Sequence, residues 1–121
     1  MIPKFRAWLK NDKKMIDVDE IHWYRDQLDF IGDGITFMRK ADEIELMQST
    51  GLFDKNGKEI FEGDIVSIDT DEFDLLFVKY EVGIYCLMDD EGCAEYLSDY
   101  YIYVSVVGNI YENPEILEGS K

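Results

Sequence analysis

The feature that most constrains the fold is an alternation of apolar and polar residues with a period of two. In residues 4–10, KFRAWLK, the side chains of Phe5, Ala7 and Leu9 share one face, and the intervening residues share the other. Such alternation is typical of a half-buried β-strand. No window of about eleven or more residues carries the 3.6-residue period of an amphipathic helix. The sequence therefore predicts a mainly β protein with little helix.

Other stretches rich in β-branched and aromatic residues extend this prediction along the chain. The predicted strands are residues 4–10, 15–25, 44–53, 65–69, 75–88 and 103–111. Within residues 15–25 the alternation slips near Asp19 and Glu20, which predicts a bulge or a bend. Gly32 and Gly34 bracket an aspartate, and the residues that follow have room for one helical turn at most.

Two glycine turns lie in the middle of the chain. Asn56-Gly57 is a dipeptide that favours a type I′ hairpin turn, in which both central residues have positive φ, and the Asp54 carboxylate is placed to cap it. Gly63 predicts a second tight turn before an apolar strand. The spacing fits neither a calcium-binding EF-hand loop nor a phosphate-binding Walker loop. We therefore interpret these four residues as structural.

The charge is strongly negative and unevenly distributed. The formal net charge is −15, and residues 60–120 contain one basic and fifteen acidic residues, a balance of −14. A chain that repels phosphate so strongly is a poor candidate for direct nucleic-acid binding. A charged partner is therefore expected to be basic, unless the carboxylates serve only solubility.

Two acidic runs in this half form a candidate interaction patch. The first run lies in a predicted loop and the second in a predicted hairpin turn, and the ends of consecutive long strands often meet. We expect the carboxylates to gather on one side of the protein. The residues are Asp69, Asp71, Glu72, Asp74, Asp89, Asp90 and Glu91.

Residues that commonly carry catalysis or hold metals are scarce. His22 is the only histidine, and together with Cys86 and Cys93 it supplies too few ligands for a zinc site. We interpret His22 as an ordinary half-buried imidazole and the cysteines as free thiols, because a reducing cytosol disfavours disulfides. We assign no catalytic residue, metal site or cofactor. The charged start of the chain and its short apolar runs predict a cytoplasmic protein without a membrane segment.

Three sequence motifs together resemble the YopX protein family of bacteriophages and prophages of Gram-positive bacteria. The motifs are FRAW near the start, LMQSTGLFDKNGKEIFEGDIV in the middle and VVGNIYENPEIL near the end. The resemblance implies a single domain over residues 1–121 with an SH3-like, partly open small barrel. Possible sub-lobes are N-terminal strands at residues 1–45, packed on a barrel at residues 46–121. It carries no catalytic residues over to this chain.

The hypothesis that follows is a non-catalytic, phage-encoded interaction module of unknown molecular function. The chain has eight tyrosines, seven phenylalanines and two tryptophans, more than a small barrel core needs. Some aromatic surface is therefore expected to contact another chain, through self-association or a basic host or phage protein. Two alternatives stay open: an acidic decoy of nucleic acid that occupies a basic host protein, and a hydrolase that uses carboxylates alone.

Overall fold

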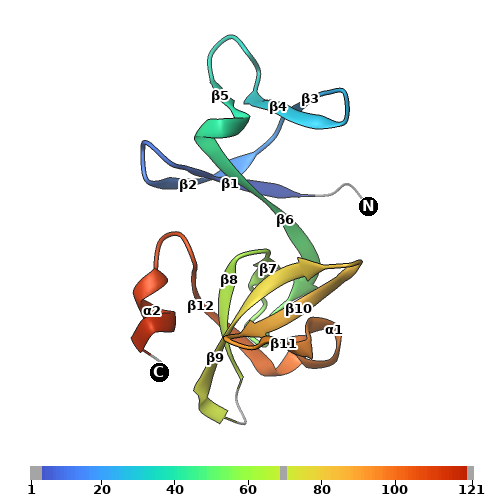
Figure 1. Cartoon of the computed structure of the whole chain (residues 1–121), viewed down its shortest axis with the longest axis vertical. Helices are drawn as coiled ribbons and strands as arrows, with labels where there is room; N and C mark the ends of the chain where they lie inside the picture. The colour runs from blue at the N-terminus through green and yellow to red at the C-terminus, as the bar shows by residue number, and fades with distance from the viewer. Residues whose placement is uncertain (1–3, 69–70, 120–121) are drawn as a thin grey trace. The chain divides into compact units, whose positions relative to one another are not determined.

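The computed structural model describes residues 4–68 and 71–119, and strands make up most of them (Figure 1). The prediction of a mainly β protein with little helix is confirmed. The chain divides into two compact units, Met1–Gln48 and Ser49–Lys121. One long strand, β6, runs through this division.

The N-terminal unit contains two small antiparallel sheets. In one, β1 lies between β2 and the first half of β6; in the other, β4 lies between β3 and β5. A single 3-10 turn, η1, precedes β6. The elements are β1 (Phe5–Leu9), β2 (Lys14–Val18), β3 (Ile21–Tyr24), β4 (Gln27–Gly32), β5 (Met38–Lys40), η1 (Ala41–Glu43) and β6 (Ile44–Phe53).

The predicted alternation explains the core of this unit. Ala7 and Leu9 are buried on one face of β1, and they pack with Ile31 and Ile44. The slip expected near Asp19 and Glu20 has a larger consequence than a bulge. The chain leaves one sheet after β2, and two residues later it begins β3 of the other sheet.

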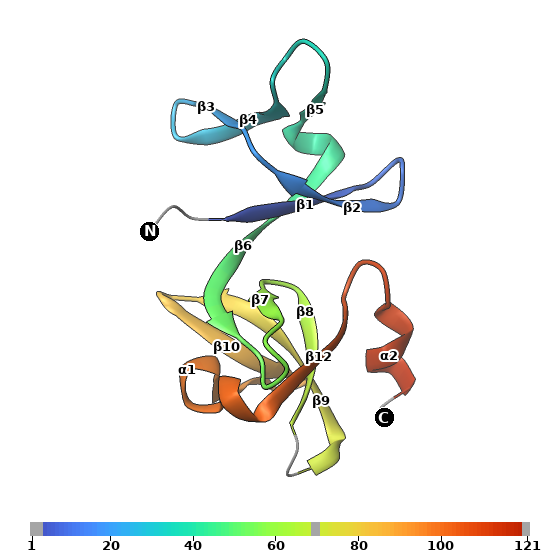
Figure 2. The same ribbon diagram turned by 180° about the vertical axis from the view of Figure 1, so that it is seen from behind.

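The C-terminal unit is built on a five-stranded antiparallel sheet in the order β11-β10-β9-β8-β12, beside the hairpin of β7 with the second half of β6. Figure 2 shows its curled strands from behind, and together they form a half-barrel. Its assignment as SH3-like stays a prediction. The elements are β7 (Glu59–Phe61), β8 (Asp64–Ile68), β9 (Asp71–Glu81), β10 (Ile84–Asp89), β11 (Gly92–Tyr96), α1 (Leu97–Tyr100), η2 (Tyr101–Tyr103), β12 (Val104–Asn109) and α2 (Pro114–Gly119).

Both faces of the central strands in this unit are covered. The inner face supplies the main core. Ile65 precedes Val66 in β8, so its side chain lies on the other face of the sheet, and it is nevertheless fully buried beside its cross-strand partner Gly108. A Cβ atom on Gly108 would lie 3.0 Å from Ile116 Cδ1, so α2 lies directly against this second face. The inner core residues are Ile60, Val66, Ile68, Leu76, Val78, Leu87, Leu97 and Val104.

The turn at Asn56-Gly57 differs from the predicted type I′ turn. Gly57 has φ +83°, whereas Asn56 is not among the residues with positive φ. The Gly57 N–H donates to Asp54 O at 3.0 Å, and the Asp54 N–H donates to Lys58 O at 2.8 Å. This pattern fits a type I turn followed by a glycine in the left-handed region. The requirement for glycine is therefore confirmed, but the predicted turn type is wrong.

Turns with two positive φ angles occur at other dipeptides. Val82 (φ 45°) and Gly83 (φ 86°) join β9 to β10, and Arg25 (φ 50°) and Asp26 (φ 64°) join β3 to β4. Val82 is 98% exposed, so packing does not compensate for the strain of a β-branched side chain there. The twist of the flanking strands selects this turn against the preference of the valine.

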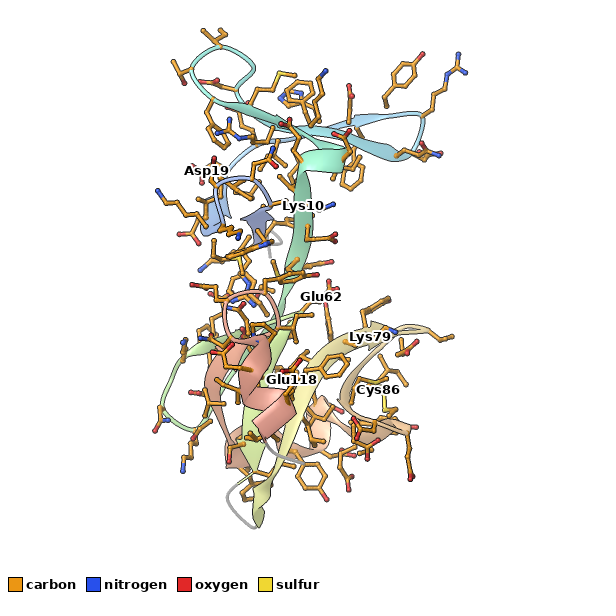
Figure 3. All side chains as sticks on the ribbon, turned by 60° about the vertical axis from the view of Figure 1, so that its left-hand side comes forward. Lys10, Asp19, Glu62, Lys79, Cys86 and Glu118 are labelled. Carbon is orange, nitrogen blue, oxygen red and sulfur yellow. A yellow bond between two sulfur atoms is a disulfide. The ribbon has the colours of Figure 1, made fainter. Side chains whose placement is uncertain are left out.

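The prediction of free thiols is wrong: Cys86 and Cys93 form a disulfide, drawn in yellow beside the Cys86 label in Figure 3. Cys93 pairs with Met88 across the β10–β11 hairpin, and a register shift occurs between Leu87 and Met88. This pairing brings the two Cα atoms to 5.5 Å, within the range of a disulfide. The expectation of free thiols rested on a reducing compartment and not on this cross-strand geometry, which places the two sulfurs within bonding reach.

We predict that Val82→Asn raises the free energy of unfolding by about 1 kcal/mol, because asparagine tolerates positive φ far better than a β-branched residue. Urea unfolding measures the change. Val82→Thr is the matched control, since threonine keeps the branched Cβ and should gain nothing. Equal stability of the Val82→Asn variant and the wild type would show that the turn stores no strain.

We predict that alkylation of the unfolded, unreduced protein labels neither cysteine, and that prior reduction exposes both. Intact-mass measurement counts the added groups. The disulfide is the reason, since a bonded sulfur does not react with an alkylating agent. Two labels on the unreduced protein would place free thiols at Cys86 and Cys93 after all.

Candidate functional site

The central motif residues serve the scaffold of the C-terminal unit. Asp54 is buried, and its Oδ1 accepts hydrogen bonds from the Asn56 and Lys58 N–H groups at 2.9 and 2.8 Å. Its Oδ2 accepts one from the Val106 N–H at 2.9 Å. Beside it, the Lys55 N–H donates to Val104 O at 3.0 Å. The carboxylate thus joins the β6–β7 turn to β12.

Gly63 is similarly committed to backbone pairing. With φ +85°, it donates its N–H to Val78 O at 2.8 Å and accepts the Ile110 N–H at 2.9 Å. The neighbouring Asp64 is buried and accepts the Phe61 N–H at 2.8 Å. These groups hold strands together and leave no open ligand loop at the motif.

The described parts of the two acidic runs belong to the start of β9 and to the end of β10 with the turn after it. The pairing of β9 with β10 ends at Phe77 and Met88. Residues 71–74 come before Phe77 in β9, and residues 89–91 come after Met88 in β10 and the following turn. Asp89, Asp90 and Glu91 are exposed. Asp69 and the side chains of residues 71–74 lie outside the described residues. The gathering of these carboxylates on one side of the protein stays a prediction.

A cleft of about 390 Å³ lies in the N-terminal unit, formed where β2 ends and β4 passes into the following loop. Its apolar lining comes from side chains that belong to, or pack against, the core of this unit. Four acidic residues contribute to the lining as well. Figure 3 labels one of them, Asp19. The lining residues are Ile16, Asp17, Val18, Asp19, Glu20, Ile31, Gly32, Asp33 and Phe37.

Gly32 shapes the cleft through its backbone. Its N–H donates to Glu20 O at 2.9 Å, which joins the end of β4 to the break after β2. It has φ +99°, and a Cβ atom there would lie 2.3 Å from Phe37 O. Only glycine allows both this conformation and this close approach.

Asp33 closes the loop that forms one wall of the cleft. Its Oδ1 accepts the N–H groups of Ile35, Thr36 and Phe37 at 2.8, 2.8 and 3.0 Å, and its Oδ2 accepts the Thr36 hydroxyl. The Thr36 hydroxyl, followed by these backbone donors, holds the pKa of Asp33 far below its usual range. The wall therefore carries a permanent negative charge at neutral pH.

His22 supports the cleft from the neighbouring strand. Its Nε2 lies 3.1 Å from Gly32 O, to which it donates when protonated there, and 3.6 Å from Glu20 Oε2. Its ring stacks on Phe30 with centroids 4.2 Å apart. The imidazole is half-buried and bound to the backbone, as an ordinary structural histidine is.

Two cations of this unit form ion pairs with carboxylates outside the cleft lining. Lys10 pairs with Glu45, and Arg39 pairs with Asp12, while the Arg39 guanidinium also lies over the ring of Phe37, which lines the cleft. Among the described residues, Asp17 and Asp19 form no ion pair. The same part of the chain contains no group of three or more histidine, cysteine or acidic side chains arranged for a metal ion. The cleft is thus a carboxylate-rimmed apolar hollow, suited to an organic cation.

The comparisons with known proteins identify the family. A family model described as YopX protein matches residues 4–118. The chain belongs to the YopX protein family. This YopX-family chain is similar to protein EF1440 from Enterococcus faecalis, with 30% identity and a TM-score of 0.74 over 97% of this chain and 99% of that one.

Protein yopX from Bacillus subtilis shares the fold, with 20% identity and a TM-score of 0.63 over 98% of each chain. No curated protein matches this chain. Within the described ranges, no helix has the length and apolar character needed to cross a membrane.

Sequence reasoning missed the cleft, although two of its signals are visible in the sequence. The slip at Asp19 and Glu20 marks the break after β2, and the paired glycines around Asp33 mark the opposite wall. Each signal taken alone indicates only a local backbone feature. Nothing in the spacing indicates that residues about a dozen positions apart line one hollow.

We predict that Asp54→Asn destabilises the protein at about pH 7 and much less at about pH 3. Burial raises the pKa of Asp54, but the N–H groups of Val106, Lys58 and Asn56, together with the Lys58 charge, lower it more, so the net shift is downward. A lowered folded-state pKa contributes stability above the unfolded value near 4, and this contribution disappears as the pH falls through the folded value.

Urea unfolding of both proteins across this pH range measures the effect. Exposed Asp29→Asn is the control, with no comparable loss expected. A stability difference between the wild type and the Asp54→Asn variant that stayed constant with pH would show that the charge itself is unimportant.

Proposed function

We propose that this YopX-family chain is a non-catalytic interaction module that binds a basic protein partner through carboxylates. The observation that carries the proposal is the cleft of the N-terminal unit, in which an apolar floor lies beside four acidic residues. A concave apolar surface with a few polar groups is the usual form of a binding site. The proposal includes an origin in a phage or prophage genome and a role in the host cytoplasm.

The non-catalytic assignment is supported by how the reactive groups are used. His22 is bound to a backbone carbonyl and stacked on Phe30, and the two cysteines are joined to each other. In a cytoplasm, disulfides are usually transient or redox-sensing, so Cys86–Cys93 would form there reversibly.

A second acidic surface, in the C-terminal unit, supports the acidic-decoy form of this proposal. Asp89, Asp90 and Glu91 are exposed in the turn between β10 and β11. Such a cluster would imitate the charge of a nucleic acid toward a basic protein.

Self-association is the third part of the proposal, and exposed apolar side chains support it. Tyr80, Val82 and Ile84 are 51%, 98% and 43% exposed at the tip of the β9–β10 hairpin. Apolar side chains gathered in this way favour contact with another chain.

The test is a pull-down from host lysate with two variants that each remove three negative charges. One is Asp17→Asn/Asp19→Asn/Glu20→Gln in the cleft, and the other is Asp89→Asn/Asp90→Asn/Glu91→Gln in the hairpin turn. We expect the wild type to retain a basic protein, identified by mass spectrometry, and the cleft variant to lose it. Loss with the turn variant instead would favour the decoy.

The salt dependence separates charge from apolar contact. The Debye length falls from about 10 Å at 0.1 M to about 3 Å at 1 M salt, so a partner held by carboxylates should elute. A partner retained at 1 M salt, or retained by both variants, would refute the proposal and assign binding to the aromatic surface. Sedimentation velocity of the same preparations measures self-association. A protein that sediments only as a monomer would refute this part of the proposal.

A further inference from the structure

We propose that the cleft of the N-terminal unit binds one lysine side chain, presented by an extended polypeptide segment that adds to the free edge of β2. This inference rests on the proposed function and names the chemistry of the partner. It joins three separate observations: the apolar floor, the charge of the rim and the position of β2 at the edge of its sheet.

The floor suits an aliphatic stem. Ile16, Val18 and Phe37 are half-buried, so they keep apolar surface for contact, and they pack on the core that contains the buried Ile31. A volume of about 390 Å³ is near the lower end for ligand sites, enough for one long side chain with its neighbours. The methylene groups of lysine pack along such surfaces while the ammonium group stays at the rim.

The rim supplies the charge that a lysine ammonium would neutralise. Asp33 already accepts four hydrogen bonds from its own loop. It therefore contributes its negative charge to the rim but has little capacity to accept a further hydrogen bond. Asp19, which forms no ion pair among the described residues, keeps its acceptors open, whereas Asp17 lies opposite Arg6 on the other face of β2 from Ile16 and Val18. An ammonium donates up to three charge-assisted hydrogen bonds to such oxygens.

Lysine fits the cleft better than arginine. The Arg39 guanidinium already lies over the Phe37 ring, 4.8 Å from its centroid, and donates to Asp12 at 3.0 Å. One face of the aromatic ring is therefore occupied by a resident guanidinium. The rest of the floor is aliphatic, and the methylene stem of lysine packs along such a surface without needing an aromatic face to stack on.

The edge position of β2 explains how the lysine would be presented. β2 is the first strand of the order β2-β1-β6-β7, and in the described chain it pairs with β1 alone. It also supplies Ile16, Asp17 and Val18 to the cleft lining. A partner strand hydrogen-bonded to this edge would place alternate side chains beside the cleft, as in β-strand addition.

The experiment is an NMR titration of the full-length ¹⁵N-labelled protein with the peptide TVTKTVT. Matched peptides carry acetyl-lysine, glutamine or arginine in place of the lysine. We expect the lysine peptide to bind at least about tenfold more tightly than the acetylated one, because acetylation removes the charge. The amide signals of residues 14–20 and 31–37 should shift most.

The matched variants are Asp17→Asn/Asp19→Asn and Asp89→Asn/Asp90→Asn. The first should weaken lysine-peptide binding about tenfold, and the second should leave it unchanged. Equal binding of the lysine and acetyl-lysine peptides, tighter binding of the arginine peptide, or shifts confined to other strands would each overturn the inference.

The outcomes also separate this inference from the proposed function. If the cleft variant loses its lysate partner while the lysine peptide does not bind, the cleft is an interface and the lysine assignment is wrong. If the peptide binds as expected but no lysate partner depends on the cleft carboxylates, the lysine site stands and the proposed function falls.

Discussion

One buried carboxylate, that of Asp54, holds the C-terminal unit together. It accepts hydrogen bonds from the turn that follows it and from Val106 in β12, a strand at the edge of the five-stranded sheet. The turn thereby covers this edge, which would otherwise offer unpaired backbone groups to other chains. It also fixes the β6–β7 hairpin, whose Leu52 and Ile60 complete the core. The half-barrel depends on this one anchor.

The N-terminal unit uses a similar device with a different result. Asp33 accepts the backbone donors of its own loop, but the loop does not connect to another strand through that carboxylate. Gly32 instead joins the loop to the break after β2 and keeps it near Glu20. The space between remains a hollow with an apolar floor. An aspartate that accepts several backbone hydrogen bonds thus covers a sheet edge in the C-terminal unit and borders a cleft in the N-terminal unit.

The turns show how strand geometry overrides local preference. Asn56-Gly57 has the composition of a type I′ turn, yet Gly57 alone of the two has positive φ, and the Asp54 carboxylate accepts the N–H groups of Asn56 and Lys58. Val82-Gly83 has an unfavourable first residue and still adopts two positive φ angles. The twist and register of the flanking strands decide the turn type, and side-chain preference then sets only its cost.

The sequence by itself determined the class of fold, because a period of two buries one face of a strand wherever that strand pairs. Residues 44–53 and the burial of Ala7 and Leu9 follow from this pattern. It also determined that Asp54 and Gly57 belong to a turn. The disulfide and the cleft were decided only by tertiary structure. A register shift in one hairpin brings Cys93 to Cys86, and the close approach of Gly32 to Glu20 and Phe37 brings two distant segments to one hollow. Register and chain packing depend on the whole set of strand pairings, which no local spacing encodes.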